Sequence, residues 1–302
     1  MKNYNLAPIS IFVYKRLNYL KTLINSLKKN ALAKKSVVYI FSDGCKNKYD
    51  KEEVLNIRKY IAKLSGFKKV YIILRQNNLG LSKNIIDGIN FVLKNNNKII
   101  VLEEDLKLSK NFLNFLNSGL KIYEREKKVA SINGWFFPLS FKKNIPDTFF
   151  IRGADCWGWG TWRRAWKKFD SNGQRLLNKI RKNKLEKLFN YNNSFNYMKM
   201  LQDQINKKNQ SWAIRWYAST FLENMYTLHP KLSLVENIGT KNGENSKFDF
   251  LNISSSITKK KYQPITKKEI IENYNARKAI ESFFNKNILY KIKEIIKFFF
   301  NV

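Results

Sequence analysis

Apolar runs of strand length alternate with helical patterns through the first 105 residues. The runs ISIFVY (9–14), SVVYIFSD (36–43), KVYIILRQ (69–76) and KIIVLEED (98–105) predict four strands. Between them apolar residues recur every three or four positions, which predicts helices from Leu17 to Leu27, over 50–64 and over 81–95. Strands that alternate with helices indicate βαβ units, so we expect an α/β fold with a mainly parallel sheet flanked by helices.

Polar side chains follow each predicted strand directly. In open parallel sheets, ligands bind beyond the carboxyl ends of the strands. The four polar clusters should therefore share one rim of the sheet and form a binding site there. They are Lys15-Arg16, Ser42-Asp43-Gly44, Asn77-Asn78-Leu79-Gly80 and Glu103-Glu104-Asp105.

The acid triplet Glu103-Glu104-Asp105 ends a buried strand in a chain that has only 23 acids. Like charges repel and are costly to desolvate. The triplet could begin a helix through LKLSKNFLNFL, because acids are favoured at helix N-termini. It could instead hold Mg²⁺ or Mn²⁺, whose oxygen shell a nucleotide diphosphate would complete. The pattern alone leaves both interpretations open.

The formal charge of +34 implies a negatively charged partner: nucleic acid, anionic lipid or a phosphorylated substrate. The lysines are scattered, so charge alone does not choose between these. Two cysteines, Cys45 and Cys156, form neither a disulfide framework nor a zinc spacing, which indicates free thiols in a reducing cytosol. The single histidine, His229, excludes a histidine-rich metal site. We find no secretory signal and no apolar run long enough to span a membrane.

The second half of the chain has a different character. All seven tryptophans lie between Trp135 and Trp216, residues 171–200 are polar and lysine-rich, and 211–225 predicts a helix. The last stretch, KNILYKIKEIIKFFFNV, is an amphipathic helical pattern. Lying on anionic lipid and docking on the protein are equally good interpretations of it. We expect two halves, 1–130 and 131–250, and a basic C-terminal helical tail, 251–302.

The stretch EEDLKLSKNFLNF resembles the GT-A glycosyltransferases, in particular N-acetylglucosaminyltransferase I and bacterial family 2-like sugar transferases. PISIFVYKR, IFSDG, QNNLGLSKN, RGADCWGWGTWRRAW and SWAIRW are similar to further stretches of these enzymes, in the same order, over residues 8 to 240. The resemblance implies the GT-A fold, a Rossmann-like mixed sheet with a nucleotide-sugar half and an acceptor half.

The resemblance also implies roles for residues on the nucleotide side. Asp105 would bind Mn²⁺ or Mg²⁺, and Glu104 stands where the usual triplet has Asp. Asp43 would hold uracil and Arg16 would lie near the nucleotide. Asn78 and Asn84 would line the same side, although a capping role suits Asn84 as well. Glu103 and Glu104 would shape the field around Asp105.

On the acceptor side the resemblance implies a general base, which must reach the acceptor hydroxyl. Asp203 is the expected base and Asp155 its rival. Trp157 and Trp159, each beside a glycine, would pack on a sugar, whereas the other tryptophans are expected in the core. Arg215 would pair either with the diphosphate or in a structural ion pair. Residues 244–246 carry Glu244, Asn245 and Ser246 where related sequences have a histidine.

The implied function is inverting transfer of a sugar from a UDP-sugar donor to a glycan or lipid-linked glycan acceptor. The expected place is the cytoplasm, at the inner face of the cell membrane. Two other classes are weighed against it: a nucleic-acid-binding protein, which the acid triplet opposes, and an inactive relative, which Glu104 and residues 244–246 suggest. The sequence does not name the sugar, the acceptor, the linkage or the oligomeric state.

Overall fold

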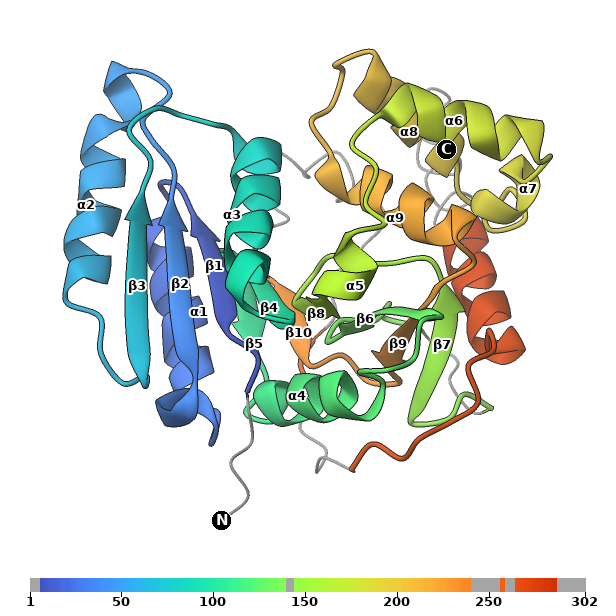
Figure 1. Cartoon of the computed structure of the whole chain (residues 1–302), viewed down its shortest axis with the longest axis horizontal. Helices are drawn as coiled ribbons and strands as arrows, with labels where there is room; N and C mark the ends of the chain where they lie inside the picture. Colours follow the sequence, from blue (N-terminus) through green and yellow to red (C-terminus); the bar gives the residue numbers. More distant parts are fainter. Residues whose placement is uncertain (1–5, 140–143, 240–255, 259–263, 287–302) are drawn as a thin grey trace, which may run out of the picture.

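The computed structural model describes residues 6–139, 144–239, 256–258 and 264–286 (Figure 1). Within them one mixed sheet has eight strands in the order β3-β2-β1-β4-β8-β6-β9-β7. Four of its seven pairings are parallel, and they include all three between β3, β2, β1 and β4. The expected mixed, mainly parallel sheet flanked by helices is confirmed. Its strands are β1 (Ile9–Val13), β2 (Val37–Ser42), β3 (Lys69–Leu74), β4 (Lys98–Glu103), β6 (Val129–Asn133), β7 (Thr148–Arg152), β8 (Trp159–Trp162) and β9 (Tyr226–Pro230).

The helices of the first half cover both faces of the sheet. The chain moves from β1 to β2 to β3 in one direction and returns past β1 to reach β4. Because such crossovers are right-handed, the first two helices share one face and contact each other, while the third lies on the opposite face. These helices are α1 (Leu17–Lys28), α2 (Lys51–Ala62) and α3 (Leu81–Asn95), each close to its predicted range.

The four predicted strands end one or two residues earlier than their apolar runs indicated. The polar clusters therefore lie in loops beyond the strand ends. No helix follows the acid triplet directly. Leu106 and Leu108 are both buried, and the short strand β5 (Leu106–Leu108) pairs antiparallel with β10 (Val235–Asn237). Helix α4 (Phe112–Ile122) begins only after that, so a helix N-terminus does not explain the acids.

Six helices of the second half lie within the described residues. They are α5 (Arg163–Trp166), α6 (Gly173–Lys182), α7 (Glu186–Phe189), α8 (Tyr197–Ile205), α9 (Trp212–Leu222) and a helix over 274–286. In Figure 1, α6, α8 and α9 lie at the upper right, on the side toward which β1, β2 and β3 point. They therefore stand on the same side of the molecule as the rim of polar loops.

Residues 264–286, expected in the tail, pack into the second half instead. Ala276, Ile280 and Phe284 are buried, and the ring of Phe284 stacks on Phe195 at 4.8 Å. The guanidinium of Arg277 lies 3.8 Å from the ring centroid of Tyr191. The helix in this segment therefore contributes its buried face to the core of the second half. The amphipathic stretch over 287–302 lies outside the described residues.

No described helix is both long enough and apolar enough to cross a bilayer.

Candidate functional site

Three polar loops meet where β1, β2 and β4 end. Parallel pairing sets Phe12 of β1 opposite Glu103 of β4, and Val13 opposite Ser42 of β2. The residues that follow these positions must leave the sheet side by side. The structure therefore brings Arg16, Asp43 and the acid triplet to one rim, as the sequence predicts.

Arg16 pairs with two acids of the triplet. Its Nε donates to Glu104 Oε1 at 2.8 Å and its Nη2 to Asp105 Oδ2 at 3.0 Å. The other oxygen of Glu104 accepts the backbone N–H of Tyr14 at 2.8 Å. Burial opposes the charge of Arg16, but Asp105 and Glu104 outweigh it and raise the pKa of the guanidinium. Glu104, which stands in for the usual Asp, is thus a buried anchor for Arg16.

The segment after β10 closes against this cluster. The N–H of Ile238 donates to the carbonyl of Asp105 at 2.9 Å. A Cβ at Gly239 would clash with the Asp105 carboxylate and press on Arg16. Only a glycine fits this close approach. Residues 244–246, where related sequences have a histidine, lie outside the described residues.

Asp43 supports a loop. Its carboxylate accepts the N–H groups of Gly44, Leu79 and Gly80 at 2.8–3.0 Å. Asn78 Nδ2 adds a contact to it at 3.3 Å and donates to the carbonyl of Gly44 at 2.8 Å. Both oxygens of Asp43 are therefore used inside the protein, and the side chain is 4% exposed. The direct contact to uracil that the resemblance implies would require these bonds to break.

Asn84 and Arg75 form a second bridge beside this loop. Asn84 is buried near the start of α3, and its Oδ1 accepts from Arg75 Nε at 3.2 Å. The Arg75 guanidinium lies 5.6 Å from the ring centroid of Phe41. Asn84 thus orients an arginine at the end of β3. Arg75 is not among the residues predicted for the site, although it lies near the end of the third apolar run.

The loop between β7 and β8 brings Asp155 to the same rim. Antiparallel pairing of β4 with β8 sets Val101 opposite Trp159, so the residues that precede Trp159 lie beyond the end of β4. Burial raises the pKa of Asp155 to about 6, against the effect of a 2.7 Å bond from the Cys156 N–H. Burial also raises the pKa of the Cys156 thiol, and the charge of Asp155 adds to this effect.

The two candidate sugar-binding tryptophans differ. Trp157 keeps 8% of its surface exposed and packs edge-on against Trp135, with ring centroids 4.9 Å apart. Trp159 has no exposed surface, and its ring packs among Trp166, Trp212 and Trp216. A fully enclosed ring has no face to offer a sugar, so packing accounts for Trp159. The tryptophans expected in the core are buried.

Asp203 and Arg215 lie on the helices of the second half. Asp203 faces solvent on α8, where it pairs with Lys199 at 2.8 Å, and no described contact joins it to the triplet. Arg215 reaches across from α9, donating from Nη2 to Ser82 Oγ at 2.6 Å and from Nη1 to the carbonyl of Ser171 at 3.1 Å. Burial lowers the pKa of Arg215. Its present role is to connect the second half with the start of α3.

The acids of the triplet suit a hard cation. Burial, followed by the charge of Asp105, raises the pKa of Glu103 to about 8, against the effect of Arg16, so a cation at this place would favour the ionised form of Glu103. Asp105 Oδ1 accepts no hydrogen bond from a described residue. Among the described residues, no group of three or more His, Cys, Asp or Glu side chains forms a complete metal site. Because Mg²⁺ needs only one or two carboxylates when phosphates complete its shell, Asp105 and Glu103 fit such an ion.

No protein-family model matches the chain, and no curated protein is significantly similar to it. Among solved structures, it is similar to TarS 1-349 of S. aureus (16% identity, TM-score 0.37, 54% of this chain and 48% of that one). The same protein in complex with UDP matches at 17% identity (TM-score 0.32, 46% and 40%). The mannosyltransferase PcManGT from Pyrobaculum calidifontis, solved with GDP-Man and Mn²⁺, matches at 9% (TM-score 0.30, 44% and 39%).

The chain thus spans less than half the length of these solved chains. A likeness this partial describes only how some elements are arranged.

Proposed function

We propose that the chain is an inverting glycosyltransferase of the GT-A kind, which moves a sugar from a UDP-sugar to a glycan or lipid-linked glycan acceptor. The observation that carries the proposal is the cluster at the carboxyl ends of β1 and β4, where Arg16 pairs with Asp105, Glu103 ends β4 and the loop with Asp155 leads into β8. Carboxylates gathered in a partly buried rim repel each other, and a cation relieves this repulsion. A cation that also binds a diphosphate gives these acids a function.

The donor's diphosphate is the group that this rim suits best. Arg16 offers a guanidinium at one side, and a divalent ion held by Asp105 and Glu103 would stabilise the negative charge of the departing diphosphate. Arg16 must then share Asp105 with the ion, since one carboxylate oxygen already accepts from it. The loop over 77–80, which Asp43 supports, would form the wall of the nucleotide site. Uridine as the base is proposed from the resemblance of IFSDG and the acid triplet.

Glu104 does not argue for an inactive relative. Its longer side chain reaches both Arg16 Nε and the N–H of Tyr14, each at 2.8 Å. Glu104 therefore positions Arg16 and leaves Asp105 available for the metal. The substitution in the triplet is compatible with a working site.

The general base is proposed to be Asp155, with Asp203 as the alternative. A base must lie within reach of the reacting hydroxyl, and its ideal pKa is near the operating pH. Asp155 lies on the same rim as the triplet and its pKa is raised to about 6. Asp203 would have to leave Lys199 to act. Trp157, two residues from Asp155, is the aromatic ring available to the acceptor or donor sugar.

The proposal is tested by incubating the full chain with a panel of UDP-sugars and measuring UDP release with Mn²⁺, with Mg²⁺ and with a chelator. We expect release with at least one donor, dependent on the metal and absent in Asp105→Asn. Asp87→Asn, an acid on the outer face of α3 paired with Lys83, is the matched control. Failure of every uridine nucleotide to bind or react in the presence of metal would contradict the proposal.

A further inference from the structure

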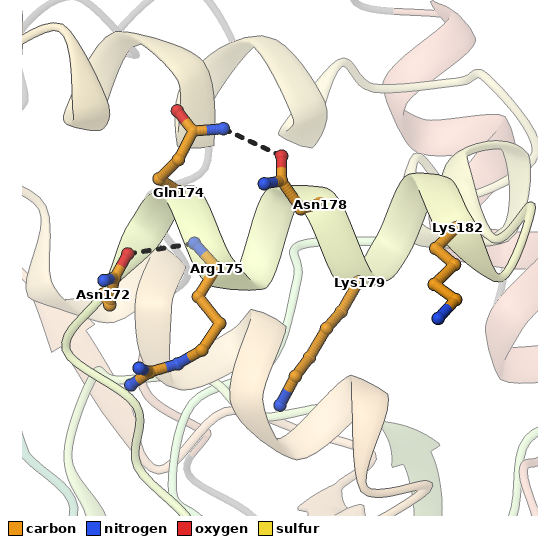
Figure 2. Close-up of a pocket in the computed structure, with 6 residues that line it drawn as sticks. All are labelled: Asn172, Gln174, Arg175, Asn178, Lys179 and Lys182. Atoms are coloured by element: carbon orange, nitrogen blue, oxygen red, sulfur yellow. Dashed lines mark hydrogen bonds between the residues drawn. The ribbon is translucent and has the colours of Figure 1, made fainter.

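Helix α6 borders a groove to which the function proposed above assigns no residue. The groove has a volume of about 390 Å³. Figure 2 shows its lining: three cationic side chains extend from α6, and Gln174 and Asn178 are joined by a 2.8 Å hydrogen bond. The full lining is Asn172, Gln174, Arg175, Asn178, Lys179 and Lys182.

The polar lining follows from how α6 packs. Its apolar residues Leu176, Leu177 and Ile180 are buried, and the helix contacts α8 and α9. The remaining positions recur every three or four residues and are exposed. They form one continuous polar surface that carries cations and carboxamides together.

Part of the positive charge of this surface is unpaired. Lys179 and Lys182 form no ion pair with any described residue. Asp170 pairs with Arg175 through two bonds of 2.6 Å, which fixes the position of Arg175 at the end of the groove. Cations near a helix C-terminus also stabilise its dipole, which is enough to explain Lys182. Asn172 caps the N-terminus of α6, where its Oδ1 accepts the N–H of Arg175 at 2.9 Å, so Gln174 and Asn178 are the carboxamides that capping does not explain.

We propose that this groove binds an anionic saccharide, a sugar chain that carries phosphate or carboxylate groups, and that this chain is the acceptor. The identity of the ligand as acceptor rests on the function proposed above. Lys179 and Lys182 pair with the anionic groups. Carboxamides both donate and accept hydrogen bonds, so Asn172, Gln174 and Asn178 match sugar hydroxyls.

The lining discriminates against other anionic partners. Single-stranded nucleic acids are held by bases stacking on aromatic rings, and no aromatic side chain lines the groove. Helices that lie on a membrane insert apolar side chains, and the lining contains none of those either. A hydroxyl-rich polyanion remains the ligand class that uses both the cations and the carboxamides.

The groove also connects with the rim. Asn172 follows Ser171, whose carbonyl accepts from Arg215, and Arg215 bonds Ser82 at the start of α3. Gln210, just before α9, approaches Gly80 of the braced loop. One end of the groove thus lies beside the contact between the two halves.

The test is binding of the full chain to labelled oligogalacturonate and phosphomannan oligomers, with neutral dextran of matched length, poly(U) RNA and phosphatidylserine vesicles as comparisons. We expect at least one anionic saccharide to bind more tightly than all three comparisons. The first two probes show whether carboxylate or phosphate is preferred. Equal or tighter binding of RNA or vesicles, or equal binding of dextran, overturns the proposal.

The decisive variant is Lys179→Gln/Lys182→Gln, compared with Lys59→Gln/Lys63→Gln on the exposed side of α2, which makes the same change of charge. We expect the Kd for the anionic saccharide to rise about tenfold in the first and less than about twofold in the second. An equal rise of the Kd in both variants would mean that the attraction is unspecific. It would overturn the proposal that the groove binds the saccharide.

UDP binding with Mn²⁺, measured on the same samples, separates the two proposals. If UDP binds and no anionic saccharide does, the groove assignment fails alone. If the saccharide binds through Lys179 and Lys182 and UDP does not, the transferase proposal fails while the groove remains a saccharide site.

Discussion

Two carboxylates are candidates for the proposed general base, and their surroundings differ. Asp155 is half-buried in the loop that meets the end of β4, whereas Asp203 lies on α8 with 25% of its side chain exposed and pairs with Lys199. Desolvation raises the pKa of a carboxyl, which makes it a better proton acceptor once it is ionised. We therefore expect the pH dependence of the reaction to follow Asp155.

The rate of metal-dependent transfer or donor hydrolysis should fall about tenfold per pH unit below pH 6, because Asp155 must be ionised to act and its pKa is raised to about 6. In Asp155→Asn this fall below pH 6 should disappear, and the rate itself should drop about 100-fold or more. Asp203→Asn is the matched comparison and should keep both the pH dependence and the rate. A full rate in Asp155→Asn and a lost rate in Asp203→Asn would reverse the assignment.

The loop over 77–80 owes its shape to Asp43. Two of the N–H groups that this carboxylate accepts, those of Leu79 and Gly80, come from a distant part of the chain. Hydrogen bonds to a buried charge contribute about 1.5–3 kcal/mol each, and they cannot be replaced by water in a closed site. The loop over 77–80 is therefore held in place by the protein itself.

Asp43→Ala should lower the free energy of unfolding by about 3 kcal/mol and weaken UDP binding, since three N–H groups lose their acceptor. Chemical denaturation measures the first effect and titration the second. Asp87→Ala, which removes an exposed pair with Lys83, should cost less than about 0.5 kcal/mol. If Asp43→Ala keeps full stability and loses only UDP binding, the side chain is a ligand of the base and not a brace.

The strand β9 carries the single histidine in a buried place. His229 is 4% exposed, lies against Phe136 and Phe149, and its Nδ1 is 3.2 Å from the carbonyl of Trp135. Burial lowers its pKa from 6.5 to about 4. It is therefore a neutral packing residue, as expected for a histidine outside the site.

Because the unfolded chain takes up a proton on His229 at higher pH than the folded chain, the stability contributed here is complete above about pH 6.5 and is lost as pH falls toward about 4. The loss should amount to about 3 kcal/mol. Unfolding of wild type and His229→Asn across this range isolates the effect, because raised carboxyl groups such as Asp155 act in the opposite direction in both. Parallel pH profiles for the two proteins would contradict the prediction.

Local pattern predicts the elements of the first half well, because each of its strands is a continuous apolar run and each helix has one apolar face. Arg16 and the acid triplet are also predictable, because parallel strands end on one side. The partners of Asp43 are not, because they arise where the chain folds back some 36 residues later. Trp157 and Trp159 look alike in the sequence, yet only the first keeps exposed surface.

At the scale of the whole molecule, the C-terminal segment completes the second half. Glu272 bridges to Phe150 of β7, and Arg277 pairs with Glu281 at 3.2 Å while donating to the carbonyl of Leu188 at 2.6 Å. The contacts of Glu272 with Phe150 and of Arg277 with Leu188 join distant parts of the chain, so they cannot be predicted from a lysine-rich tail sequence. They attach the C-terminal segment to the second half.

Phe284→Ala should lower the free energy of unfolding by about 3–5 kcal/mol, because the ring is 1% exposed and its removal leaves a cavity. Tyr274→Ala on the same helix, 70% exposed, should cost less than about 0.5 kcal/mol. Denaturation curves of the two variants make the comparison. Similar small losses in both would mean that the helix is a loosely attached tail after all.

The proposed function depends most on one site, where Asp105 and its neighbours are proposed to hold a metal ion and a uridine diphosphate. Isothermal titration of UDP into the full chain, with Mn²⁺ and with a chelator, tests it most directly. We predict binding that requires Mn²⁺ and weakens at least about 30-fold, roughly 2 kcal/mol, in Asp105→Asn but not in Asp87→Asn. Binding that is indifferent to Mn²⁺ and to Asp105, or no binding at all, would contradict the account.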